Sequence, residues 1–251
     1  MSALYTTYTS SNVSQLTSTI SSTNTTTDKH RSELDSHADT CCFGRHAAIV
    51  GHYDQTVRVT PFHPDLAGMS DIPIVNAAVA YDDPTTGRTK ILQFNQVLHF
   101  STMEHNLICN MQLRCNDIDI DECPKFLSSH PTDTTHTISV PLAETRIPLF
   151  LHGTTQYFTT RTPTDRELVT CETIDMTYEY PDWDPHSSTF AEEEENMMDS
   201  QCQVRHPPNR DRDRDIFGAT TRFAKPTDRP APHSHVAAIR VAQHNSQIYP
   251  R

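Results

Sequence analysis

The sequence predicts a mostly-β domain, on the basis of three patterns. Residues 53–60 alternate between apolar and mostly polar side chains, as expected for a strand with one solvated face. Residues 77–100 form two extended arms around a turn at 82–87, which indicates a β-hairpin. Residues 61–68 carry two prolines and a glycine, which remove ladder donors and permit tight bends, so a loop is expected there.

The other elements of this domain are predicted from shorter signals. Residues 46–50 are a short apolar run ending at Gly51, which predicts a buried strand, and residues 72–75 predict another extended segment. Ser101 and Glu104 have the spacing of a capping box, which marks the start of a helix. The buried face of that helix is expected to consist of Leu107, Ile108, Met111 and Cys115.

We expect the chain to divide into four parts. Residues 1–30 are rich in Ser and Thr and predict a disordered leader, and residues 31–125 hold the compact domain. Residues 126–185 are β-rich and either extend the sheet or form a small subdomain. Residues 186–251 combine runs of charge with prolines, which predicts a disordered tail.

Composition limits the classes of function. Only 35% of the 251 residues are apolar and the net charge is −12, so one compact domain is expected and direct nucleic-acid binding is not. No run of about twenty apolar residues predicts a membrane span. The seven cysteines are scattered and no secretory leader is recognised, so free thiols and a cytoplasmic location are expected.

The candidate site is the stretch 34–40, Leu-Asp-Ser-His-Ala-Asp-Thr. A loop that presents a catalytic carboxylate needs that carboxylate at the end of a short strand and a hydroxyl beside it. Asp35 and Ser36 meet both requirements. Asp39 lies where a second carboxylate could hold the backbone amide of a substrate. The pairs 133–134 and 199–200 are the nearest further Asp-hydroxyl candidates, and neither follows an apolar strand.

This loop resembles that of the retropepsins, and within them the proteases of Copia-type retrotransposons. Residues 97–100, followed by 104–108 and 111–113, are similar to the apolar strand and Asn-Leu-Ile helix start of that family. The resemblance implies a closed β-barrel of the acid-protease type with one C-terminal helix. It also implies an aspartic endopeptidase that processes a gag-pol polyprotein and contains neither cofactor nor metal.

The resemblance also assigns roles to residues. Each subunit of a homodimer would contribute one catalytic Asp35, since two carboxylates must share a proton and the chain has one matching loop. Ser36 would form loop-to-loop hydrogen bonds between the subunits. The substrate would be contacted by His37, Ala38 and Asp39. A flap over residues 57–75, with its tip within 61–71, would include Phe62, His63, Leu66 and Gly68.

The sequence leaves several alternatives open. The family usually has glycine at position 37, so the loop either accepts His37 pointing outwards with its chemistry intact, or the fold persists without activity as a dimeric interaction module. A metal site would need closely spaced Cys or His pairs, whereas Cys109, Cys115 and Cys123 are far apart in the sequence. A nucleophilic Cys41 or Cys42 is a further option, although we expect buried thiols behind the loop.

Overall fold

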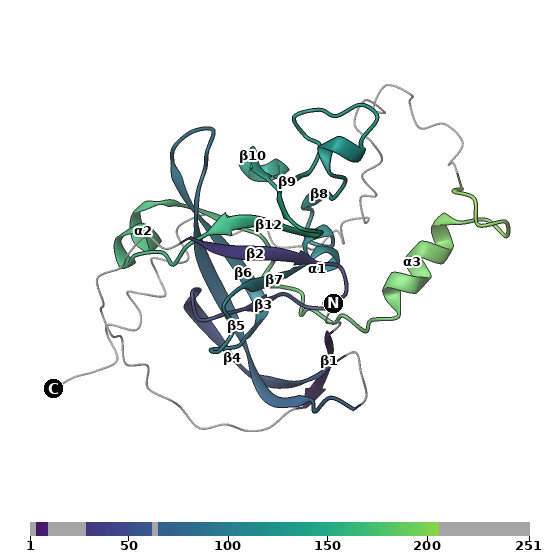
Figure 1. Ribbon diagram of the computed structural model, residues 1–251. Helices are drawn as coiled ribbons and strands as arrows, with labels where there is room; N and C mark the ends of the chain where they lie inside the picture. Colours follow the sequence, from purple (N-terminus) through teal and green to yellow (C-terminus); the bar gives the residue numbers. More distant parts are fainter. Residues whose placement is uncertain (1–3, 10–28, 62–64, 206–251) are drawn as a thin grey trace.

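The computed structural model describes residues 4–9, 29–61 and 65–205 (Figure 1). The structure is 45% strand and 15% helix by residue, which confirms the mostly-β class. The strands are β1 (Leu4–Thr9), β2 (His30–Asp35), β3 (Cys42–Phe43), β4 (Ala48–Pro61), β5 (Met69–Asp82), β6 (Thr89–His99), β7 (Asn106–Cys109), β8 (Asp119–Asp121), β9 (Thr137–Val140), β10 (Thr145–Pro148), β11 (Phe150–His152), β12 (Thr155–Thr160) and β13 (Glu172–Asp175). The helices are α1 (Asn110–Arg114), α2 (Asp165–Thr170) and α3 (Thr189–Met197), with 3-10 turns η1 (Lys125–Leu127) and η2 (Pro141–Ala143).

Ten strands form one large sheet in the order β1-β4-β5-β6-β3-β7-β2-β12-β11, with β13 parallel to β6. Its ends are β1 and β11, so the described strands do not make the expected closed barrel. One bridge joins the two arms of the sheet, through Ala80 N to Arg161 O (2.9 Å) and Arg161 N to Ala80 O (3.0 Å). Pairing stops there because Pro163 has no N–H donor and α2 begins two residues later.

A chain of buried polar groups links four neighbouring strand segments. The Asn106 amide on β7 accepts a hydrogen bond from Gly44 N (3.0 Å) and donates one to Ser32 Oγ on β2 (3.1 Å). Ser32 Oγ in turn contacts Thr160 Oγ1 on β12 at 2.9 Å. All three side chains are at most 2% exposed. Since an unpartnered buried polar group is costly, these bonds hold β12, β2, β7 and the end of β3 in one register.

Two predicted hairpins are present. The β5–β6 hairpin matches the expected arms, with Asp82 opposite Thr89. The β4–β5 hairpin is longer than expected, because residues 46–50 are not a separate buried strand: β4 runs on through Gly51, and Val50 is 43% exposed. The pairing register shifts at Gly51, where a Cβ would meet Asn76 Nδ2 at 3.0 Å, so the glycine bends the strand without ending it.

The predicted helix after Ser101 is wrong at its start. Residues 106–109 form strand β7, and α1 is only five residues long. Glu104 does not cap a helix but contacts Arg45 and His46, and Met111 is 43% exposed. The apolar positions here suit a helix and a buried strand equally, and parallel pairing with β2 decides between them.

The outer parts of the chain also depart from expectation. Residues 4–9 lie within the expected disordered leader but form strand β1, antiparallel to β4. Within 126–185, β11 and β12 extend the large sheet, whereas β9 and β10 join β8 in a separate three-stranded sheet. Residues 189–197 of the expected tail form α3, so the expectation of a single helix is wrong too. The tail beyond Arg205 lies outside the described residues.

The core joins these segments. Its largest cluster contains residues from both sheets, among them Phe43, Phe94, Ile108, Ile138 and Phe158, each fully buried. The rings of Phe43 and Phe94 lie 4.7 Å apart between centroids. Among the described residues, no helix has the length and apolar character needed to cross a membrane.

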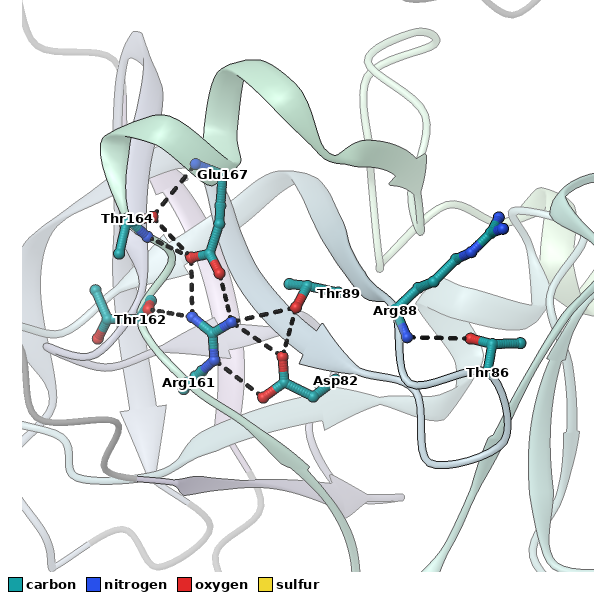
Figure 2. Close-up of polar contacts among 8 residues, drawn as sticks. All are labelled: Asp82, Thr86, Arg88, Thr89, Arg161, Thr162, Thr164 and Glu167. Atoms are coloured by element: carbon teal, nitrogen blue, oxygen red, sulfur yellow. Dashed lines mark hydrogen bonds and ion pairs between the residues drawn. The ribbon is translucent and has the colours of Figure 1, made fainter.

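Arg161 lies at the bridge between the two arms and binds two carboxylates (Figure 2). Its guanidinium donates to Asp82 on β5 (2.9 and 3.0 Å) and to Glu167 of α2 (2.5 and 2.9 Å). Glu167 also completes a capping box with Thr164 at the start of α2. These bonds from Arg161 lower the pKa of Asp82 and lower that of Glu167 to about 2. The side chains of Arg161 and Glu167 are 12% and 21% exposed, so this pair is poorly screened by solvent, whereas the Asp82 side chain is 39% exposed and its pair is screened more strongly.

Replacing Arg161 with Met should lower the free energy of unfolding by about 2 to 3 kcal/mol, because two carboxylates lose their donor. Both carboxyls have lowered pKa values in the folded state, so their stabilising contribution is present above their unfolded pKa values and fades as pH falls towards about 2. The deficit of Arg161→Met should therefore shrink between pH 6 and pH 2.5 in urea titrations.

Arg88→Ala is the matched control for this experiment. Arg88 is exposed, and Figure 2 shows its side chain pointing away from the cluster. Its loss should change the free energy of unfolding by less than about 0.5 kcal/mol at either pH. Equal losses for the two variants would contradict the structural role given to Arg161.

Candidate active site

Asp35 is the last residue of β2, between two paired strands. On one side β2 runs parallel to β7, with Asp35 opposite Cys109, and on the other side it pairs with β12. Because β7 lies between β2 and β3, the connection through residues 36–41 has to cross the end of β7, where α1 begins. The Asp35 side chain is 18% exposed, so its carboxylate is presented at the end of the strand and remains accessible.

The tip of the loop is exposed and organised by short-range bonds. The backbone N–H of His37 donates to Asp35 Oδ1 (2.9 Å), and Ser36 Oγ lies 3.3 Å from His37 Nδ1. The His37 side chain is 57% exposed, and its backbone is not among the positive-φ positions of the described chain. The loop therefore forms here without the conformational freedom of glycine, and the imidazole points outwards.

Ala38 and Asp39 are less exposed than the tip. Ala38 is 5% exposed and packs in the core, so its side chain anchors the loop. The Asp39 side chain is 16% exposed, and its Oδ2 lies 3.8 Å from His186 Nε2. Trp183 Nε1 donates to the Asp39 carbonyl and to Thr40 Oγ1, both at 3.2 Å.

Sequence reasoning missed Trp183 and His186, which lie about 145 residues further along the chain. Trp183 is the only tryptophan of the protein and stands in an otherwise polar, acidic stretch. Such a large apolar side chain has little reason to stay in water. That isolated tryptophan was the available signal that this stretch packs against the domain.

The flap residues are placed in part. Phe62 and His63 lie outside the described residues; Leu66 is 53% exposed and Gly68 is half-buried, both in the connection from β4 to β5. The base of this hairpin faces the loop around a cavity of about 60 Å³. The residues that line the cavity are Thr40, Tyr53, Gln55, Ile74, Gln96, Leu98, Asp182 and Trp183.

Three thiols pack behind the loop: Cys41 and Cys42, as expected, and also Cys109. Cys41, Cys42 and Cys109 are completely buried. The Cys41 thiol accepts from Cys109 N (3.2 Å), and the Cys109 thiol accepts from Gln112 N (3.3 Å) as the cap of α1. Burial raises the pKa of all three thiols, that of Cys109 to about 11. They are therefore protonated at neutral pH and are poor nucleophiles. No group of three metal-ligating side chains comes together among the described residues.

Brief treatment with iodoacetamide at pH 7.5 should modify Cys123 and Cys202, which are exposed, before the buried thiols. We expect Cys41, Cys42 and Cys109 to react at least about a hundredfold more slowly, because reaction requires local opening of the core. Peptide mass spectrometry over time measures the order. Rapid modification of Cys41 in folded protein would contradict the packing described above.

Comparisons of the chain with protein-family models, with curated proteins and with solved structures return no match. Any function assigned to the chain therefore depends on its residues and on the geometry of this loop. The features available for that assignment are the accessible carboxylate of Asp35, the strand order around it and the nearby β4–β5 hairpin.

Proposed function

We propose that the chain is one subunit of a homodimeric, retropepsin-like aspartic endopeptidase that cuts the polyprotein of a Copia-type retroelement. The position of Asp35 carries the proposal: a partly exposed carboxylate at a strand end, in a loop that crosses a neighbouring strand. The order of elements supports it, since the loop is followed by the β4–β5 hairpin, the β5–β6 hairpin, β7 and then α1.

In this type of peptide hydrolysis a water molecule is held between two carboxylates that share one proton. The protonated carboxyl polarises the scissile carbonyl, and the ionised one accepts a proton from the attacking water. Close like charges resist double ionisation, which keeps the single proton in place. Each subunit needs to present one carboxylate at an accessible surface, and Asp35 is placed to do so.

The two Asp-hydroxyl pairs outside the loop, at 133–134 and 199–200, are not placed to supply the second carboxylate. Asp133 is exposed in the connection between η1 and β9. Asp199 Oδ1 accepts hydrogen bonds from Gln201 N (2.8 Å) and Gln203 N (2.9 Å) in a turn beyond α3. We therefore assign the second carboxylate to the same residue of a second copy, related by a twofold axis. The exposed Ser36 and His37 lie on the part of the loop that would meet that axis.

Asp35→Asn should reduce cleavage of a denatured protein substrate at mildly acidic pH by at least about 10²- to 10⁴-fold, because both carboxylates of the homodimer are replaced by amides that cannot exchange the proton. Asp133→Asn, at the start of the other Asp-Thr pair, is the control and should retain full activity. Product formation is followed by mass spectrometry. Cleavage that survives in Asp35→Asn would indicate another nucleophile, and its absence in the wild-type protein would favour the dimeric interaction module.

Mixing subunits tests the shared site directly. A heterodimer of wild-type and Asp35→Asn chains has one catalytic carboxylate, so it should be inactive. When an equal amount of the variant is added to a fixed amount of wild-type chain and the subunits exchange, the total number of dimers doubles and a quarter of them are wild type on both sides. The activity should therefore fall to about half that of the same amount of wild-type chain alone. Sedimentation velocity on the same samples should show twice the mass of the chain. Undiminished activity, or an active monomer, would contradict the proposal.

A further inference from the structure

The segment of residues 177–186, here called the strap, crosses from β13 to the catalytic loop. Its first part is anchored in the core. Thr177 is 1% exposed, its hydroxyl accepts from Asn95 N (2.6 Å) and its carbonyl accepts from the Asn95 amide (2.6 Å). Tyr178 N donates to Asn116 Oδ1 at 2.7 Å, beside the end of α1. These bonds fix the first part of the strap to β6 and to the segment after α1.

The middle of the strap is held by one side chain, Gln96. Its amide nitrogen lies within hydrogen-bond distance of the carbonyls of Tyr178 (3.1 Å), Glu179 (3.0 Å) and Pro181 (2.9 Å). Its amide oxygen accepts from Trp183 N at 2.5 Å. Gln96 is 8% exposed and keeps a left-handed φ of 56°, a conformation that is unfavourable without such compensation. The hydrogen bonds of the Gln96 side chain are all to backbone groups of the strap, which bends around it.

The last part of the strap contacts Asp39 directly. The Trp183 indole donates to the Asp39 carbonyl, and His186 lies 3.8 Å from its carboxylate. Trp183 also lines the small cavity between the loop and the base of the β4–β5 hairpin. Asp39 is the residue that the sequence analysis predicts to hold the backbone amide of a substrate. The chain's own segment therefore sits where a substrate strand would need to lie.

The outer part of the strap leads into α3. The Trp183 ring lies 5.9 Å from that of Phe190 of α3 between centroids, tilted by 46°, and α3 buries no residue. Figure 1 shows α3 lying outside both sheets. A movement of Trp183 outwards with α3 would break its bonds to Gln96 Oε1, Asp39 and Thr40. Thr177 and the contacts of the Gln96 amide nitrogen with three strap carbonyls would keep the rest in place. Such a movement would leave the core packing unchanged.

From these contacts we infer that the strap is autoinhibitory: Trp183 and His186 cover Asp39 and are displaced when a peptide strand binds between the loop and the β4–β5 hairpin. The inference rests on the proposed function and names a regulation of the same site. The occupant that displaces the strap is an extended polypeptide, because the groups released are a backbone carbonyl and a carboxylate, which pair with backbone N–H donors.

Trp183 is the only tryptophan, so its fluorescence reports directly on the strap of the unmodified protein. A statine-containing peptide, which mimics the tetrahedral intermediate of aspartic proteases, is titrated while calorimetry measures binding. We expect the emission to move to longer wavelength as the peptide binds, because the indole leaves its site. Binding heat without a change in emission would overturn the inference and leave the proposed protease intact. No binding to any form of the protein would contradict both.

Variants provide a second test. The double change Trp183→Ala/His186→Ala should tighten binding of the same peptide at least about tenfold, because no strap has to be displaced. Trp183→Phe, which keeps the ring and lacks the N–H donor, should have a smaller effect in the same direction. Phe126→Ala/His130→Ala is the matched control, since both residues are exposed and lie outside the strap. Equal affinity of the strap variant, the control and the wild-type protein would overturn the inference.

Discussion

The hydrogen-bonded chain from Gly44 through Asn106 and Ser32 to Thr160 is the constraint on which the site depends. It crosses four strand segments at the centre of the large sheet, where no water is available to replace a lost partner. These hydrogen bonds stabilise one register of the strands, because a shift of β2, β7 or β12 by one residue would leave polar groups buried and unpaired. The register places Asp35 opposite Cys109 and so puts the carboxylate at the end of β7.

Residues 161–164 explain why the two arms of the sheet meet at one bridge and do not pair further. Arg161 makes one bridge to Ala80 and ties β5 to α2 through its side chain. Pro163 and the capping box at Thr164 then turn the chain into a helix. The ion pairs of Arg161 take over where backbone pairing ends, so the two arms are joined by side chains as well as by backbone bonds.

The two ends of the loop at residues 34–40 differ in their surroundings. At Ser36 and His37 the loop is exposed, whereas at Asp39 and Thr40 it is covered by Trp183. An exposed tip suits a partner subunit, and a covered end suits a regulated substrate site. The loop is held between them by the buried Ala38 and by the protonated thiols behind it. Its geometry is thus set by the core and does not depend on a residue in the left-handed conformation at position 37.

The sequence by itself determined the mostly-β class, the hairpin around residues 82–87 and the position of Asp35 at the end of a strand. Each of these is predicted by a pattern of neighbouring residues: alternation of apolar and polar side chains, turn-forming residues, or an apolar run before a polar one. Only the tertiary structure decided that residues 106–109 are a strand, that residues 4–9 pair with β4 and that Trp183 covers Asp39. These features depend on pairings between segments from about 50 to 145 residues apart, and no local pattern specifies which distant partner a segment will find.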